Sequence, residues 1–230
     1  MNAHLKIAAL RKLMKKHGVD AYYVPSADPH QSEYLPENYK FRAWLSGFTG
    51  SMGEPGTPEM PAWVAKQLKK GQALGMDPSV VSLAAADSFA KALAPHGIKV
   101  KFVTPNLVGR IWKERPESSL APMVNHPAKF AGETVASKLK RVREAMKDVG
   151  AKAHVIGALD QVAWLLNVRA ADIEFTPVVT SYAVVTDRAC TIYVDPRKVT
   201  KGAEKALKGK ARIKDCLLYT SDAADDVSTV

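Results

Sequence analysis

Cysteine is scarce in this chain, and long hydrophobic runs are missing from it. The 230 residues include only two cysteines, Cys190 and Cys216, which is too few for a disulfide framework and is typical of a reducing compartment. No stretch approaches the roughly 20 apolar residues of a membrane-spanning helix. Residues 1–6 contain no apolar segment of signal-peptide length. The sequence therefore predicts a soluble, cytoplasmic protein with no membrane partner.

Acidic residues are fewer than basic ones, 23 against 33, which gives a formal net charge of +10. Lysine and arginine neutralise phosphates, so this excess raises the question of nucleic-acid binding. The lysines are scattered, however, and no aromatic side chains alternate with them to stack on bases. We interpret them as solvated helix faces and predict no nucleic-acid partner; a steep salt dependence of DNA affinity would support the opposite view. They are Lys12, Lys15, Lys16, Lys138, Lys140, Lys147, Lys198, Lys201, Lys205, Lys208, Lys210 and Lys214.

The chain contains two similar segments, in each of which a helix pattern is followed by a glycine, a strand and a Trp-Leu pair. The apolar residues of each helix recur at i, i+3 and i+7, the spacing of one helix face. Each glycine marks the end of its helix, because a residue without a Cβ adopts the left-handed conformation most easily. Two domains built on one helix–strand plan explain the pattern better than chance. The first segment has Ile7, Leu10, Met14, Gly18, 21–24 and Trp44-Leu45; the second has Leu139, Val142, Met146, Gly150, 153–156 and Trp164-Leu165.

The other elements complete an α/β architecture. Helices are expected at residues 61–70 and 84–94, and a strand at 99–103. Residues 182–186 and 190–194 flank a short polar turn and predict a hairpin. Residues 118–132 are interrupted by prolines and are predicted to be an interdomain linker.

Longer motifs run through the chain in a fixed order. They are Val24-Pro25-Ser26-Ala27-Asp28-Pro29-His30-Gln31-Ser32-Glu33-Tyr34, Arg42-Ala43-Trp44-Leu45-Ser46-Gly47-Phe48-Thr49-Gly50-Ser51, His126-Pro127, Ala131-Gly132-Glu133 and Ala158-Leu159-Asp160-Gln161-Val162-Ala163-Trp164-Leu165-Leu166-Asn167-Val168-Arg169. Together they resemble the front part of the cytosolic-type Xaa-Pro aminopeptidases (aminopeptidase P), over nearly all of residues 1–215.

This resemblance implies a three-domain metallopeptidase that removes an N-terminal residue preceding proline. Two tandem creatinase-N-like (ribonuclease H-like) domains, with mixed sheets and covering helices, would precede a pita-bread catalytic domain. That third domain would hold two divalent metal ions, commonly manganese. The substrates would be proline-containing peptides, and the parent enzyme can form homodimers. Because the Xaa-Pro bond is a tertiary amide without an N–H, general peptidases that bind this donor fail there.

Three departures from the family are visible in the sequence. The metal ligands of the family belong to the third domain, so we expect the catalytic domain to be absent and the chain to contain no catalytic residue and no metal ligand. After Ser51 an internal deletion is expected, which would remove strands from the first domain. A lost strand of about six residues takes roughly three inward side chains with it, so two lost strands cost on the order of 10 kcal/mol. We therefore expect the first domain to be unstable or open-edged.

The third departure is the C-terminal segment, residues 216–230. From Cys216 to Asp225 it resembles one reading frame of a transposon-end sequencing adapter, and we interpret it as a non-native tail. The alternative is a natural polar tail without a fold of its own. The predicted domains are then residues 1–117 and the incomplete middle domain 133–215, joined by the linker 118–132.

A first cluster of polar residues, Asp28, His30 and Glu33, lies within six positions. Carboxylate and imidazole groups suit Mn or Zn, but the cluster follows a strand in a proline-containing loop and has no second cluster to complete the coordination. We interpret it as a motif that orders the loop through hydrogen bonds to the local backbone.

A second group, Asn167, Arg169 and Asp172, follows a short predicted helix. The resemblance places this loop on the side that faces the catalytic domain, where it would pair structurally with that domain or contact substrate. Two positions differ from the usual family residues: Ala170 replaces a glycine and Thr176 an asparagine.

The resemblance leads to two hypotheses of function. In the first, the chain is the non-catalytic front portion of a proline-specific metalloaminopeptidase and is inactive alone. In the second, it is a non-catalytic, creatinase-like module that binds protein partners. The DNA beyond the codon of Cys216 would discriminate between them, because metal-ligand motifs continuing in frame would favour the enzyme.

Overall fold

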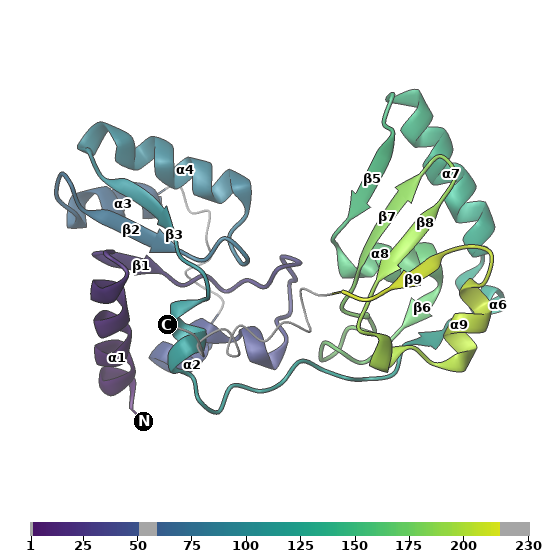
Figure 1. Cartoon of the computed structure of the whole chain (residues 1–230), viewed down its shortest axis with the longest axis horizontal. Coiled ribbons are helices and arrows are strands. Elements are labelled where there is room, and N and C mark those ends of the chain that lie inside the picture. The colour runs from purple at the N-terminus through teal and green to yellow at the C-terminus, as the bar shows by residue number, and fades with distance from the viewer. Residues whose placement is uncertain (1, 51–58, 217–230) are drawn as a thin grey trace, which may run out of the picture. The chain divides into compact units, whose positions relative to one another are not determined.

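The computed structural model describes residues 2–50 and 59–216, which form two compact units with their boundary between Glu117 and Ser118 (Figure 1). The segment directly after Ser51, where a deletion is predicted, lies outside the described residues. So does the predicted foreign tail, except for Cys216 itself. No helix in residues 2–50 and 59–216 is long and apolar enough to cross a membrane.

Unit 1 is built on a parallel sheet with strand order β1-β2-β3. Its elements are α1 (Ala3–Lys16), β1 (Ala21–Tyr23), η1 (Glu37–Tyr39), α2 (Phe41–Ser46), α3 (Glu59–Gln67), β2 (Ala73–Met76), α4 (Leu83–Leu93), η2 (Ala94–His96), β3 (Lys99–Phe102) and α5 (Leu107–Ile111).

Helices cover both faces of this sheet. Alternate strand residues point to opposite faces, and in β2 Leu74 and Met76 pack with Phe89 of α4 and with α3. Ala73 and, from β1, Tyr22 pack on the other face, in the cluster that contains α1, α2 and α5. Unit 1 therefore has two hydrophobic clusters, one on each side of three strands.

Unit 2 contains a four-stranded mixed sheet with order β5-β7-β8-β9, and a separate two-stranded sheet of β4 and β6. In the main sheet only β8 and β9 are parallel. The elements are β4 (Val124–Asn125), α6 (Ala128–Ala131), α7 (Val135–Asp148), β5 (Ala153–Ile156), α8 (Leu159–Leu166), β6 (Val168–Arg169), β7 (Tyr182–Thr186), β8 (Cys190–Tyr193), η3 (Pro196–Lys198), α9 (Lys201–Leu207) and β9 (Arg212–Lys214).

The α/β architecture of the sequence prediction is confirmed, and so is the hairpin, which is β7–β8. The mixed sheet expected in both domains is found in unit 2, whereas the described strands of unit 1 are all parallel. The stretch interpreted as a linker, residues 118–132, contains strand β4 and helix α6. Met123 within it is fully buried in the hydrophobic cluster of unit 2. Its amide donates to the Lys198 carbonyl at 2.7 Å, and its carbonyl accepts from the Thr200 hydroxyl.

The two units repeat the same helix–glycine–strand geometry. Helices α1 and α7 each have 14 residues and begin with a side-chain cap, from Asn2 and Thr134 respectively. Each is followed, two residues after its last residue, by a glycine in the left-handed region, Gly18 at φ +61° and Gly150 at φ +68°. In both, the next residue donates its N–H to the carbonyl of the methionine five positions earlier. Strands β1 and β5 then begin three residues after the glycine, so they are equivalent elements.

A lysine–tryptophan contact occurs at the same place in both units. Lys6 and Lys138 are each the fourth residue of their helix. Lys6 donates to the Trp44 carbonyl at 2.5 Å, and Lys138 to the Trp164 carbonyl at 2.8 Å. Each ammonium group also lies over the indole ring, 4.2 and 4.6 Å from its centroid, within range of a cation–π interaction. The contact ties helix α1 in unit 1, and helix α7 in unit 2, to the short helix that carries the Trp-Leu pair.

The repeated glycine can be tested with two substitutions of opposite sign. Gly150→Ala should lower the free energy of unfolding of unit 2 by about 1–2 kcal/mol, because an alanine Cβ is strained at positive φ. Gly202→Ala, inside α9 with no close neighbour, should raise it by roughly 0.5–1 kcal/mol through helix propensity. Urea denaturation followed at the backbone amides of β7 measures both. Equal effects of the two variants would contradict the role given to Gly150.

Candidate functional site

Asn167 ends helix α8 and connects three parts of unit 2. It adopts φ +50°, the left-handed conformation that Asn tolerates better than most residues. Its side chain is buried: Oδ1 accepts from Lys138 Nζ at 2.7 Å, and Nδ2 donates to the Glu133 carbonyl at 2.9 Å. Its own carbonyl accepts from the His126 amide at 2.7 Å. All these polar groups are paired, so the start of the loop is held firmly.

Lys138 is the counterpart of Asn167 in this network and is only 2% exposed. Its ammonium donates to two neutral acceptors, Asn167 Oδ1 and the Trp164 carbonyl. Burial is the main cause that lowers the pKa of Lys138, while the Glu133 carboxylate acts in the opposite direction. The prediction that Lys138 belongs to a solvated helix face is therefore wrong, because its side chain is buried against Trp164 and Asn167.

Arg169 follows on β6, which pairs antiparallel with β4. Its Nη1 donates to the carbonyls of Ala163 and Val168, at 2.7 and 2.8 Å. Arg169 is half-buried and lines a pocket of about 560 Å³ within unit 2. The pocket is mainly apolar and is lined by Pro122, Val124, Arg169, Ala170, Ala171, Ile173, Phe175, Thr176 and Pro177. A planar cation beside an apolar hollow suits a ligand with a carbonyl or carboxylate next to a nonpolar group.

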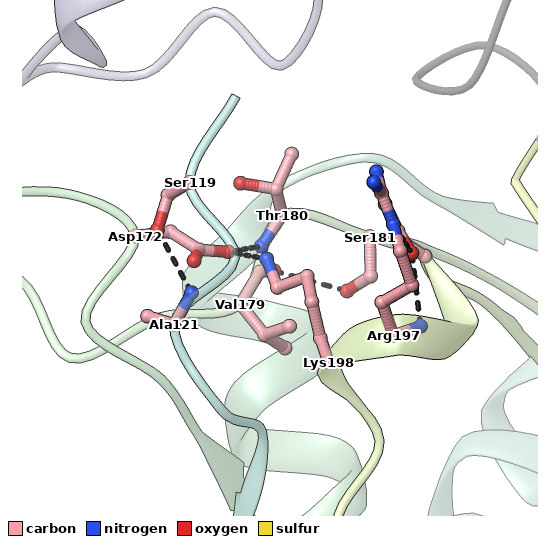
Figure 2. Close-up of polar contacts among 9 residues, drawn as sticks. Ser119, Ala121, Asp172, Val179, Thr180, Ser181, Arg197 and Lys198 are labelled. Carbon is pink, nitrogen blue, oxygen red and sulfur yellow. Dashed lines mark hydrogen bonds and ion pairs between the residues drawn. The ribbon is translucent and has the colours of Figure 1, made fainter. Parts of the chain in front are cut away.

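Asp172 is held by a buried ion pair with Lys198. Figure 2 shows Lys198 Nζ and the Thr180 amide both directed at Asp172 Oδ2. The side chains of Lys198 and Asp172 are 2% and 0% exposed. Asp172 Oδ1 is buried and has no hydrogen-bond partner within the described ranges. The pair ties the loop to helix η3, which contains Lys198.

Asp195 caps the start of helix η3, which contains Arg197 and Lys198. Figure 2 shows the side chains of Arg197 and Lys198. The Asp195 carboxylate accepts from the Arg197 amide at 2.9 Å and from its guanidinium at 2.6 Å. These hydrogen bonds lower the pKa of Asp195. Lys198 was also predicted to be solvent-exposed, and this too is wrong, because η3 turns its side chain into the unit, where it meets Asp172.

The segment between Asp172 and Val178 turns back on itself. Ile173 and Thr176 form an antiparallel bridge, and Phe175 at the turn has φ +63° and is 86% exposed. A phenylalanine in this region of φ carries strain that the surrounding structure must offset. The Thr176 amide donates to the Ile173 carbonyl at 3.2 Å. The turn thus presents an aromatic ring to solvent beside the pocket.

Asp28, His30 and Glu33 lie in unit 1, on the loop after β1. Asp28 is 1% exposed, and its Oδ1 accepts from the amides of His30 and Ser32, both at 2.9 Å. The Gln31 amide donates to the Asp28 carbonyl, with Gln31 at φ +55°. Glu33 is exposed. The structure thus brings Asp28 and His30 together through main-chain contacts and leaves Glu33 outside.

Among residues 2–50 and 59–216 there is no group of three or more His, Cys, Asp or Glu side chains placed to hold a metal ion. The described residues therefore do not fit the metal centre that the family resemblance implies.

The comparisons with known proteins define the family. A sequence profile of the creatinase/prolidase N-terminal domain matches residues 114–228, half of the chain. The chain belongs to this family, which confirms the resemblance seen in the sequence motifs.

Particular relatives are Xaa-Pro aminopeptidases. Aminopeptidase P1 of Arabidopsis thaliana is 34% identical over 240 residues, covering 88% of this chain and 37% of the relative. A probable Xaa-Pro aminopeptidase P of Pyrenophora teres f. teres is 34% identical, covering 91% and 37%. The crystal structure of an X-prolyl aminopeptidase from Caenorhabditis elegans, described as a cytosolic enzyme with a di-nuclear active site, matches with a TM-score of 0.86 at 27% identity. It covers 94% of this chain and 42% of that one.

Two facts about length follow from these matches. The chain corresponds to the N-terminal portion of its relatives and spans 37–42% of their length. The alignment with the Arabidopsis protein also runs over 240 residues although it includes only 88% of 230. The relative therefore carries residues within the matched span that this chain lacks. That these missing residues lie directly after Ser51 remains a prediction from the sequence.

The buried ion pair of the loop can be tested by a double-mutant cycle. Lys198→Met leaves the Asp172 carboxylate buried without its cation, so unit 2 should lose about 3–5 kcal/mol of stability. Asp172→Asn should be costly for the converse reason. The double variant should lose less than the sum of the two single losses, by about 2 kcal/mol or more. Additive losses in urea denaturation would show that the two groups do not interact.

Proposed function

We propose that this chain is the non-catalytic front portion of a cytoplasmic metal-dependent aminopeptidase that releases the N-terminal residue from peptides with proline in second position. The observation that carries the proposal is the match to the C. elegans X-prolyl aminopeptidase, which includes 94% of this chain and 42% of that enzyme. In this proposal the two divalent ions, manganese by the resemblance, bind in the portion of the parent enzyme that lies outside the match. Dimerisation of the parent would likewise depend on that portion.

In this proposal the loop from Asn167 to Val178 faces the catalytic portion and helps to frame the peptide. Asn167 and Asp172 are positioning residues, because their buried polar contacts hold the two ends of the loop. Arg169 and the apolar pocket form the surface that the loop presents. A peptide that begins Xaa-Pro offers a carbonyl and an apolar ring, but no N–H at the bond to be cut. An arginine beside a nonpolar hollow is complementary to those features.

Inactivity of the chain alone can be measured directly. Purified protein with Mn²⁺ and a Xaa-Pro peptide should release the N-terminal residue no faster than a blank with Mn²⁺ only, while the C. elegans enzyme under the same conditions serves as the positive control. Turnover that exceeds the blank and disappears with a chelator would refute the proposal.

The role of the loop requires an active protein. In a hybrid that carries residues 118–215 of this chain within the C. elegans enzyme, Arg169→Ala should lower kcat/KM for a Xaa-Pro peptide by about tenfold or more, because orientation of the substrate is lost. Lys152→Ala, an exposed lysine of the same unit, is the matched control and should leave kcat/KM unchanged. An active hybrid in which both variants behave alike would contradict the role given to Arg169.

A further inference from the structure

Three cationic side chains from three elements of unit 1 converge on the end of helix α1. Lys101 of β3 donates from Nζ to the His17 carbonyl at 2.7 Å. Arg110 of α5 places Nη1 3.4 Å from His17 Nε2. Lys16 is the last residue of α1, and His17 follows it directly. We call these four residues, Lys16, His17, Lys101 and Arg110, the His17 cluster.

The cations of this cluster have hydrogen-bond donors to spare. Lys16, Lys101 and Arg110 are exposed, and none of them forms an ion pair within residues 2–50 and 59–216. An ammonium group has three N–H donors and a guanidinium has five, whereas the contacts with His17 use one donor of Lys101 and one of Arg110. The remaining donors are available to a ligand from solvent.

The end of helix α1 does not balance this positive charge. A helix C-terminus acts as about half a negative charge. The carbonyls of Leu13, Met14 and Lys15 already accept main-chain amides, and that of His17 accepts from Lys101. Helix α1 contains no acidic residue. Three full positive charges therefore stand against about half a negative one, and the cluster has a positive excess.

Unit 2 shows that the repeated plan does not require the cluster. By the equivalence of α1 and α7, the residues that correspond to Lys16 and His17 are Asp148 and Val149. Asp148 carries the opposite charge, and Val149 is apolar and 79% exposed. Helix α7 nevertheless ends in the same way, before a left-handed Gly150. The cluster is therefore specific to unit 1 and exceeds what the fold of the repeat needs.

The charges of the cluster act on the His17 imidazole. Burial is the main cause that lowers the pKa of His17, and the three cations of the cluster lower this pKa further. The acid nearest to His17 in the sequence, Asp20, is directed elsewhere, to the Ala73 amide. A negative ligand between the cations would offset their repulsion, and it would therefore raise the pKa of His17.

We propose that the His17 cluster binds a doubly charged oxyanion, namely a phosphate group. The three cations offer only donors and approach from three elements, which suits a tetrahedral ion whose oxygens accept hydrogen bonds. A single carboxylate has one charge and two oxygens, and would leave part of the excess uncompensated. Phe102, next to Lys101, points to the opposite face of β3, so its exposed ring offers a nucleic-acid base no stacking partner at the cluster. The inference rests on contacts within unit 1, and its failure leaves the proposed function untouched.

The test uses the full chain labelled with ¹⁵N and two probes, inorganic phosphate and sulfate, at an ionic strength held constant with NaCl. Phosphate should give saturable NMR shifts of the Gly18 amide and the His17 imidazole. Sulfate stays doubly charged throughout the pH range in which histidine titrates, so it isolates the response of the protein. Sulfate should raise the pKa of His17. Its affinity should increase as the pH falls through that pKa, because the protonated imidazole adds a positive charge.

Variants that remove one charge each locate the site. Arg110→Gln and Lys101→Gln should each weaken phosphate binding by about tenfold or more, because each removes a charge-assisted contact. Lys91→Gln changes an exposed lysine of α4, which covers the other face of the sheet. It removes the same charge and should leave the dissociation constant unchanged. The amide shifts of β2 report whether each variant keeps unit 1 folded.

Glycerol 3-phosphate identifies the source of the phosphate group. Binding as tight as that of free phosphate assigns the site to a phosphorylated ligand, and weaker binding assigns it to the free ion. Shifts that do not saturate, an unchanged pKa of His17, or equal weakening by all three variants would overturn the proposal. So would a response of unit 2 only, an unfolded unit 1 that neither ion orders, or tighter binding of a single-stranded oligonucleotide whose shifts extend over both units.

Discussion

Strands β1 and β5, which follow the equivalent helices α1 and α7, each have two hydrogen-bonding edges, and only one edge of each is paired within the described residues. Main-chain donors and acceptors that are buried without partners are costly, so the pairing of this strand governs how the rest of its unit is built. In unit 1 the parallel side is filled, and helices α3 and α4 pack over it. In unit 2 the antiparallel side is filled by the β7–β8 hairpin. The two units thus preserve complementary halves of one plan.

Buried cations distinguish unit 2. Lys138 and Lys198 are both nearly inaccessible to solvent, and their charges are compensated by different partners. The ammonium of Lys138 faces neutral oxygens and an indole ring, and that of Lys198 faces a carboxylate. Burying a charge is unfavourable unless its hydrogen bonds are satisfied. Both lysines bind the same loop: Lys138 binds its first residue, Asn167, and Lys198 binds Asp172. The polar interior of unit 2 therefore holds this loop near both of its ends.

Much of the fold could be predicted from local patterns. The helix stripes, the left-handed glycines at positions 18 and 150 and the β7–β8 hairpin depend on spacing and on backbone conformation, which short sequences encode. The order of motifs predicted the family correctly. Lys138 and Lys198 were misjudged because their burial depends on residues far along the chain, Trp164 and Asp172. The ordered elements of residues 118–132 were missed for the same reason, since β4 is a strand only because β6 lies beside it.

For the candidate site, the residues could be predicted from the sequence, but the different role of each residue could not. Asn167, Arg169 and Asp172 were singled out together, yet Asn167 and Asp172 are buried anchors and Arg169 lines the pocket. The lysines that hold these two anchors, Lys138 and Lys198, were predicted to be solvated and were not assigned to the site. One signal could have located Lys138: Lys6 stands at the same place in the first repeat, and both precede a Trp-Leu pair.

The cationic strands β3 and β9 have a consequence for the width of the sheet. Each stands at the end of the series of strands in its unit, β3 on the parallel side and β9 on the antiparallel side. If the sheets of the two units are superposed on their equivalent strands, β1 and β5, the cationic strands β3 and β9 lie at opposite ends. The strands between them carry no lysine, arginine or carboxylate side chains. Electrostatic repulsion between these cationic edge strands would then prevent the sheet from pairing, edge to edge, with the sheet of another molecule.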